Sequence, residues 1–340
     1  MTALPPPAEV AHLLLACPQL TPTPLTAYRT LVLPAESAAL SKGDQASLVH
    51  ARVLGYLLLY PPSQEARRSL LLEISSCQSA DVEKQHEAVF ELGAKYLKHF
   101  ISIYCPEDLQ RVPRDHSRAK ASALVRDNYR CMVTGVPDMD AVSLNLTPAS
   151  PDGDFTVTRC SYIFPEALGN MEIAGATAKP LQEHEAATVW TILQRFGYGD
   201  IRAELGSAAS QGASLHRLEN ILTLDTRIHR MFDTFKIWFE AVEGQPHCYA
   251  IALAPGLGRP PFIPKRVQFV SHRPGLPLPS PRYLELHAAC CRIAHLSGAA
   301  EYLDLYYSQM DDLQVLAANG ASADVLSFAL HRRLGGLDPD

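Results

Sequence analysis

The stretch ENILTLDTRIHRMFD, residues 219–233, changes from an extended pattern to a helical one near its middle. Its first part, NILTLD, has the pattern of a strand or extended segment, and TRIHRMFDTF follows with helical spacing. Upstream, VSLNLTP and FTVTRCSYIF show the weak alternation of two short strands, separated by the polar turn SPDGD. Together these segments predict a small sheet that leads directly into a helix.

The segments on either side of this core have mainly helical patterns. Residues 1–43 are rich in Pro, Ala and Leu and carry few helix start signals, so we expect a loose arm there. Helical spacing from Asp44 onward predicts a helical scaffold over residues 44–110. The core is predicted over residues 111–254, and a Pro-rich arm with C-terminal helices packed on the core over residues 255–340. The expected fold class is α+β, a ββα core wrapped by N-terminal and C-terminal helices.

Composition narrows the class of protein and of partner. The 340 residues are 47% hydrophobic and 19% charged, which is enough apolar material for a sizeable core. No apolar run approaches the roughly 20 residues that span a bilayer, and no signal peptide is recognisable, so we predict an intracellular protein, cytoplasmic or nuclear, with no membrane partner. The eight cysteines include no C-x-x-C pair, which fits reduced thiols. A net charge of −6 provides no global attraction to nucleic acid, so such binding would need a local basic patch.

An asparagine followed nine residues later by a histidine, Asn220 and His229, fits one half of a ββα-metal site. In such a site a strand-borne histidine activates a water molecule, and the helix histidine holds a divalent metal against the phosphate. The asparagine fixes the turn between strand and helix through hydrogen bonds to the backbone. The alternative is a turn-capping asparagine and an ordinary core or surface histidine, and the spacing alone leaves both open.

A basic stretch, residues 111–130, precedes the predicted strands. It holds six Lys or Arg residues against two Asp residues. As a phosphate-contacting helix it would bind nucleic acid; as an ordinary solvated helix face it would bind nothing. Directly after it, CMVTG has the form of a tight turn in which Gly135 adopts a positive φ. The candidate phosphate contacts are Arg118, Lys120, Arg126 and Arg130.

Three blocks of the sequence carry a resemblance to a known family: AKASALVRDNYRCMVTG, SYIFPEALGN and ENILTLDTRIHRMFDTFKIWFE. They resemble the HNH endonuclease-like family widespread in fungi, whose pattern is A-L-x-R-D-x-x-R-C-x-x-T-G, then A-H-I, then N-x-x-x-L-x-x-x-x-H-x-x-F-D. The likeness continues through LPSPRYLELHAACCRIAHLSGAAEYL and covers roughly residues 45–330. It implies an HNH-like ββα-metal core that hydrolyses phosphodiesters of nucleic acid. It also implies one divalent metal (Mg²⁺, Mn²⁺, Ni²⁺ or Zn²⁺) held by His229 and Asp233, with Asn220 as organiser.

The chain departs from that pattern at the A-H-I motif, where it has Ser161-Tyr162-Ile163. A tyrosine has an ordinary pKa of about 10, so it is a poor proton acceptor at neutral pH unless a cation lies close by. Losing a general base typically costs about 100- to 10,000-fold in rate. One neutral imidazole, that of His229, is too few ligands for a dependable divalent site, although Asp233 or Asp225 could help. The sequence therefore leaves open whether the protein binds one divalent metal or none.

Three other histidines were candidates to replace the missing base, and each has the simpler interpretation of a surface residue. His216 precedes Asn220 by four residues, His184 begins a predicted helix, and His116 lies in the basic stretch. The predicted catalytic set therefore stays Tyr162, Asn220 and His229.

Three functions remain open from the sequence. The first is an HNH nuclease-like protein whose metal-dependent phosphodiester cleavage is weak or lost. The second is a repurposed acid/base enzyme (an isomerase, cyclase or lyase, in the manner of fungal secondary metabolism) acting on a small organic substrate, with Tyr162 as proton donor and His229 or Asp233 as its partner. The third is a non-catalytic binding protein. The sequence leaves the substrate and the oligomeric state undetermined.

Overall fold

A computed structural model of the chain describes residues 2–14, 23–104, 116–165, 180–205 and 215–305. The chain divides into two compact units, Met1–Ala300 and Glu301–Asp340. In the second unit the described residues, 301–305, are helical. All elements discussed below belong to the first unit. None of its described helices combines the length and apolar character needed to cross a lipid bilayer.

The N-terminal scaffold is a set of helices built around α4. Three helices begin at a side-chain N-cap, in which the side chain accepts a hydrogen bond from a backbone N–H of the first turn. The capping residues are Asp44, Ser63 and Asp81, which are of the types preferred at this position. Helix α4 is buried along nearly its whole length and packs against α3 and α6. The helices are α1 (Pro7–Leu14), α2 (Pro24–Ala27), α3 (Leu33–Lys42), α4 (Gln45–Leu59), α5 (Gln64–Ser76) and α6 (Val82–Tyr96), with π-helical turns at Tyr28–Val32 and Leu97–Ile101 and a short 3₁₀ turn at Ser102–Tyr104.

The expectation of a loose N-terminal arm is wrong for residues 24–42, which are helical. Tyr28 and Val32 are fully buried there. The Glu36 carboxylate accepts hydrogen bonds from the Arg52 guanidinium at 2.6 Å and from the Leu4 backbone N–H at 3.0 Å. The helices form because they bury apolar side chains against α4, a tertiary contribution that outweighs weak local start signals.

A two-stranded antiparallel sheet and the helix that follows it form the ββα core. Strand β1 (Thr158–Tyr162) pairs with β2 (Ile221–Asp225), so that Tyr162 lies opposite Ile221 and Thr158 opposite Asp225. Helix α12 (Thr226–Asp233) begins directly after β2 and packs on β1 and β2. Helix α7 (His116–Arg126) packs on both strands and on a 3₁₀ turn at Leu218–Asn220, and the short helix α8 is Met139–Ser143. Helix α10 (Pro180–Arg195) packs on α11 (Gly199–Leu205) and on α5 of the scaffold.

One predicted strand is absent from the core. VSLNLTP, residues 142–148, continues the short helix α8 and then turns, so the prediction of a strand there is wrong. Asp138 explains the helix, because its carboxylate accepts from the backbone N–H groups of Asp140 and Ala141. The predicted strand within FTVTRCSYIF is confirmed as β1, and Gly135 has the predicted positive φ, 70°.

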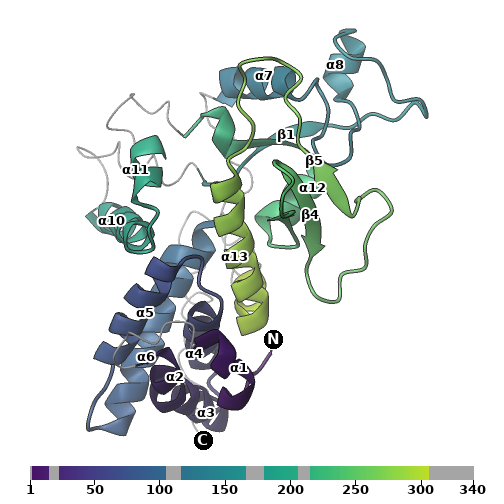
Figure 1. Cartoon of the computed structure of the whole chain (residues 1–340). Helices are drawn as coiled ribbons and strands as arrows, with labels where there is room; N and C mark the ends of the chain where they lie inside the picture. The colour runs from purple at the N-terminus through teal and green to yellow at the C-terminus, as the bar shows by residue number, and fades with distance from the viewer. Residues whose placement is uncertain (1, 15–22, 105–115, 166–179, 206–214, 306–340) are drawn as a thin grey trace, which may run out of the picture. The chain divides into compact units, whose positions relative to one another are not determined.

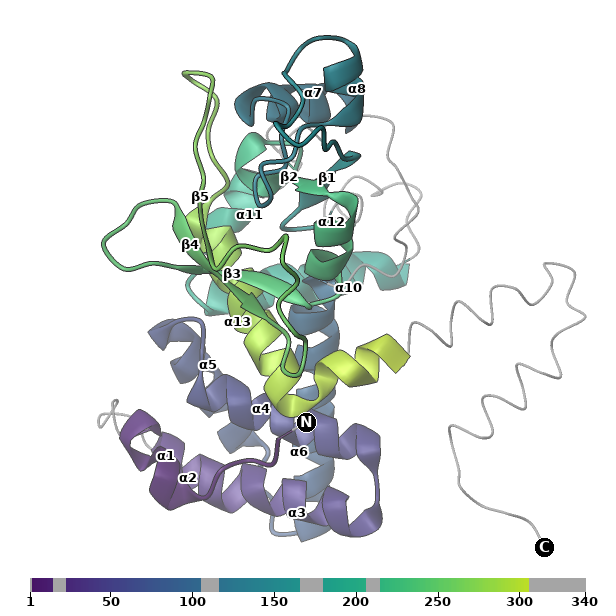
Figure 2. The same ribbon diagram turned by 90° about the vertical axis from the view of Figure 1, so that its right-hand side faces the viewer.

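A second, three-stranded antiparallel sheet follows α12, with strand order β3-β4-β5. The predicted hairpin is confirmed as β3 (Ile237–Ala241) and β4 (Cys248–Leu253), and the Pro-rich segment adds β5 (Arg266–Gln268). Helix α13 (Pro281–Ser297) packs against both β3 and α4, and it can be followed between them in Figures 1 and 2. The architecture is mixed helix and sheet, which confirms the predicted α+β class.

Helix α13 also holds α12 in place through a buried histidine. The imidazole of His287 stacks on the Phe232 ring with centroids 3.9 Å apart and planes 12° from parallel. Burial lowers the pKa of His287 to about 3, so this imidazole is neutral at physiological pH and behaves as an aromatic core residue. This stack joins α13 to the helix that carries His229.

Candidate functional site

Asn220 sits at the centre of the ββα core with no exposed surface. Its side-chain oxygen accepts from the Phe164 backbone N–H at 2.8 Å, and its amide nitrogen donates to the carbonyls of Phe164 at 3.0 Å and Leu215 at 3.1 Å. The backbone adds a further bond, in which the Ile163 N–H donates to the Asn220 carbonyl at 3.0 Å. The side chain therefore joins the segment that leaves β1 to the turn that enters β2.

The start of α12 is fixed by Asp225. Its carboxylate accepts from the Arg227 backbone N–H at 2.8 Å and from the Thr156 hydroxyl at 2.6 Å, and it is paired with the Arg227 guanidinium at 3.0 Å. Burial alone would raise the pKa of Asp225, but the hydrogen bonds from Arg227 and Thr156 outweigh it and lower that pKa. The carboxylate of Asp225 therefore serves as the N-cap of α12.

His229 and Asp233 lie one helical turn apart and contact one another. The distance from His229 Nε2 to Asp233 Oδ2 is 3.4 Å, and the Ser161 hydroxyl approaches Asp233 Oδ1 at 3.5 Å. Asp233 is only 8% exposed, and burial raises its pKa to about 7 against the opposing hydrogen bond from Ser161. At neutral pH this carboxyl therefore divides between its acid and carboxylate forms, which weakens it as a metal ligand.

Tyr162, at the end of β1, is hydrogen bonded to a histidine that the predicted site did not include. The phenol oxygen lies 2.7 Å from His216 Nδ1, and the two rings meet edge to face with centroids 5.6 Å apart. Both side chains are half-buried. The signal that points to His216 is its place four residues before Asn220, where the 3₁₀ turn brings the chain back toward β1.

The two faces of β1 carry different groups, because successive side chains of a strand point to opposite sides. Cys160 and Tyr162 belong to the face that packs on α7, in a cluster with Ala119 and Ala123. Ser161 belongs to the other face, where it contacts Asp233 of α12. Tyr162 of the phenol–imidazole pair therefore lies on one face of β1. The His229–Asp233 pair of α12 contacts the other face, through the adjacent residue Ser161.

The predicted phosphate contacts divide between internal and surface roles. Arg126 is fully buried; its guanidinium pairs with the Asp127 carboxylate in two bonds of 2.8 Å and donates to the carbonyls of Leu218 at 2.8 Å and Ile221 at 3.0 Å. The expectation that Arg126 contacts phosphate is therefore wrong, since it is an internal brace between α7 and the ββα core.

Two of the other predicted phosphate contacts, Arg130 and Lys120, are half-buried. Arg130 is half-buried and donates to the carbonyls of Gly135 at 3.0 Å and Pro148 at 2.9 Å. Lys120 is half-buried and acts electrostatically on Asp138. The side chain of Arg118 lies outside the described residues. The local positive surface is thus smaller than the sequence suggests.

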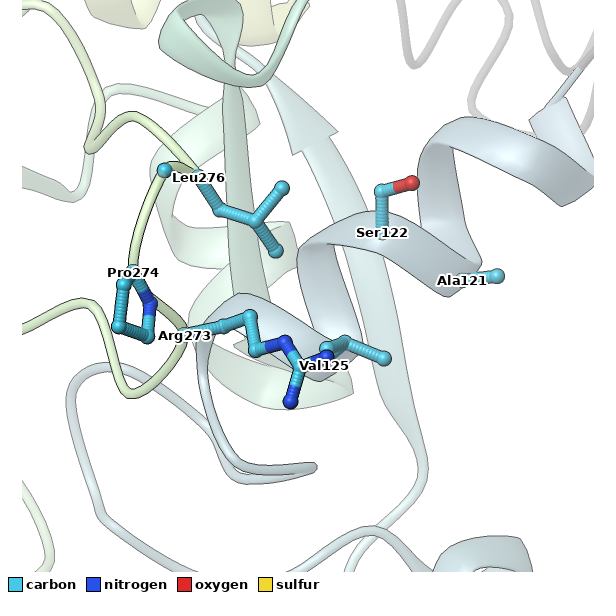
Figure 3. Close-up of a pocket in the computed structure, with 7 residues that line it drawn as sticks. Ala121, Ser122, Val125, Arg273, Pro274 and Leu276 are labelled. Carbon is cyan, nitrogen blue, oxygen red and sulfur yellow. The ribbon is translucent and has the colours of Figure 1, made fainter.

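A groove of about 460 Å³ runs between α7 and the loop before α13. The loop is anchored where the His272 backbone N–H donates to the Arg126 carbonyl at 2.8 Å. Figure 3 shows the Arg273 side chain lying beside Val125. None of the predicted site residues lines this groove. Its lining residues are Ala121, Ser122, Val125, Arg273, Pro274, Gly275 and Leu276.

A family model described as HNH endonuclease matches residues 131–240. This span is an HNH-like domain. It includes β1, β2 and α12, and with them Tyr162, Asn220 and His229. No curated protein and no solved structure shows significant similarity to the chain.

HNH domains typically use a divalent metal, which protein side chains have to hold. The described residues include no group of three or more His, Cys, Asp or Glu side chains placed to hold a metal. His229 and Asp233 supply one imidazole and one carboxyl that is partly protonated at neutral pH. Two such donors do not make a dependable divalent site, so the described part of the HNH-like domain does not fit a resident metal.

Proposed function

We propose that the HNH-like domain of this protein has weak or no metal-dependent phosphodiester cleavage. The observation that carries the proposal is Tyr162, which stands at the end of β1 where the HNH pattern places its general-base histidine. A phenol with an ordinary pKa of about 10 does not deprotonate water efficiently at neutral pH. Losing the base alone lowers the rate by about 100- to 10,000-fold.

The helix side of the site supports the same proposal. His229 and Asp233 offer two donors, and protonation of Asp233 competes with metal binding near neutral pH. A metal ion also has to be held in place to polarise a phosphate and its attacking water. The domain keeps the backbone frame of an HNH site and its helix histidine, and it departs from the HNH pattern at the strand position.

Affinity for nucleic acid is expected to be weak for electrostatic reasons. The chain carries a net charge of −6, and Arg126 is withdrawn from the basic stretch by burial. Each phosphate that a protein neutralises releases counterions, so a surface that neutralises few phosphates gains little affinity from this source. Nucleic acid is thus a weak partner in this proposal.

Plasmid nicking tests the proposal. The unmodified protein should produce no cleavage above a chelator control in Mg²⁺, Mn²⁺ or Ni²⁺. Tyr162→His, which restores an imidazole at the end of β1, should show weak metal-dependent nicking. Tyr60→His adds an imidazole at an exposed site in the scaffold, outside the HNH-like domain, and should remain inactive. Strong cleavage by the unmodified protein that His229→Ala abolishes would overturn the proposal.

A second function, acid/base catalysis on a small organic substrate, is favoured by one specific observation. The phenol of Tyr162 is paired with an ionisable imidazole at 2.7 Å. The sequence suggested His229 or Asp233 as the partner of Tyr162, whereas the hydrogen bond joins it to His216. Proton transfer to or from an organic substrate needs such a pair and does not need a metal.

A further inference from the structure

We propose that Tyr162 and His216 form a proton-transfer pair that stands in for the strand histidine of the HNH-like domain. The inference rests on the proposed function, because it takes the domain to act without metal-activated water. It assigns the role of proton store to His216, and that of contact with the substrate to the phenol oxygen of Tyr162.

The geometry of the pair suits direct proton transfer. A separation of 2.7 Å between the phenol oxygen and Nδ1 is short for a hydrogen bond between oxygen and nitrogen. The edge-to-face arrangement, with ring planes 71° apart, leaves the imidazole edge directed at the phenol oxygen. Both side chains are half-buried.

Asn220 holds both partners in position. Its amide binds the backbone of Phe164, two residues after Tyr162, and the carbonyl of Leu215, the residue before His216. One buried side chain therefore fixes the distance between the two segments that carry the pair. Such support allows a proton-transfer geometry to exist before a substrate binds.

The proton moves between substrate and imidazole through the phenol. In the forward direction the phenol oxygen takes one proton from the substrate while its own proton passes to His216 Nδ1. The substrate loses one proton, Tyr162 remains a neutral phenol, and the imidazole becomes an imidazolium. The reverse step returns the proton, and no electrons are exchanged with a third group.

The relay explains how a tyrosine can work near neutral pH. The charge comes to rest on an imidazole, whose ordinary pKa of about 6.5 is close to physiological pH, and not on a phenolate. A general acid or base works best when its pKa lies near the pH of operation. The substrate class is an organic molecule with one acidic O–H or carbonyl-activated C–H group.

Several charged groups surround the pair. The turn after His216 carries an ion pair, Arg217 Nη2 to Glu219 Oε1 at 2.7 Å. The other described ionisable groups on the elements packed around Tyr162 are Arg159 and Cys160 of β1, Lys120 and the buried Arg126 of α7, and Asp225 of β2. His216 lies at hydrogen-bonding distance from the phenol.

Ultraviolet titration of tyrosinate on the full chain tests the pair. The spectrum of Tyr162→Phe subtracted from that of the unmodified protein isolates the ionisation of Tyr162. The background from several buried tyrosines is shifted to higher pH, because burial raises the pKa of Tyr56, Tyr198 and Tyr249 to about 12. Burial raises the pKa even further for Tyr28, Tyr96, Tyr104 and Tyr283.

The same subtraction in His216→Phe should shift the phenolate midpoint of Tyr162 by about one pH unit, because the hydrogen bond between the phenol and the imidazole is lost. His272→Phe, which alters an exposed histidine, should leave it unchanged. If His216→Phe does not fold, His216→Gln replaces it, with the ¹⁵N titration of His216 in Tyr162→Phe as a second reading of the coupling. A midpoint that is the same in all these proteins overturns the inference.

The outcome is separable from that of the proposed function. Metal-dependent plasmid cleavage together with a coupled titration would refute the proposed function and leave the coupling of the two rings standing. Absence of cleavage together with an uncoupled titration would refute the proton-transfer pair alone.

Discussion

Replacing Asn220 with alanine removes an amide that makes three hydrogen bonds inside the core, to Phe164 N–H, Phe164 C=O and Leu215 C=O. A neutral hydrogen bond contributes about 1 kcal/mol net to folding, so the three together suggest a loss of about 3 kcal/mol. This value is a lower bound if no water molecule reaches the backbone groups of Phe164 and Leu215, since each unsatisfied buried group costs about 1–3 kcal/mol.

Urea unfolding of Asn220→Ala, followed by circular dichroism in the presence of chelator, measures this loss. Gln245→Ala is the matched control, because it deletes an amide from an exposed turn and should change the free energy of unfolding by no more than about 0.5 kcal/mol. Asn220→Ala also offers a second measurement. Because it releases the segments that carry Tyr162 and His216, the phenolate midpoint of Tyr162 should approach that in His216→Phe. A loss of stability below about 1 kcal/mol with the coupling intact would refute our account of Asn220.

Two further perturbations test the charges buried in the domain. Asp233 has its pKa raised by burial to about 7 from about 3.8, so the folded state holds the proton more tightly than the unfolded state. Its contribution to stability is full below about pH 4 and declines by up to about 4 kcal/mol as the pH rises to about 7, above which both states are ionised. Asp233→Asn should therefore flatten the unfolding free energy between about pH 4 and 7, and parallel pH profiles would contradict this. Arg126→Met should cost about 3–5 kcal/mol in urea unfolding, because it leaves the buried Asp127 carboxylate unpaired, while Lys120→Met should be nearly neutral; equal effects would mean that Arg126 is no brace.

The ββα core was predictable because its signals are local. Asp225 ends an alternating segment and caps the next helix, and both facts are visible within a few residues of sequence. The strand prediction at residues 142–148 is wrong for a related reason. Asp138 is an N-cap for a helix of only five residues, too short to display helical periodicity, so the weak alternation that follows was read as a strand.

The errors at Arg126 and in the N-terminal arm arise from tertiary structure. The charge of a residue does not show whether its side chain is buried. The positions of Ala119, Ala123 and Arg126, however, follow the i, i+4, i+7 spacing of one helix face. That stripe places Arg126 with two buried alanines, and the residue is buried because Asp127 and backbone carbonyls offer it partners. The helices of residues 24–42 depend on α4, which no local pattern can supply.

The pairing of Tyr162 with His216 could not be read from the sequence, because it joins residues 54 positions apart through the register of β1 against β2. Its position matters for how such a site can change chemistry. Ser161 turns the other face of β1 toward Asp233, so donors added on the α12 side would rebuild a metal site without touching the phenol. The phenol–imidazole pair instead depends on Asn220, the residue that also shapes the ββα turn. In our proposal, a chain with a tyrosine at the strand position keeps its frame and gains a proton carrier, because the same amide that stabilises the fold sets the distance between the phenol and the imidazole.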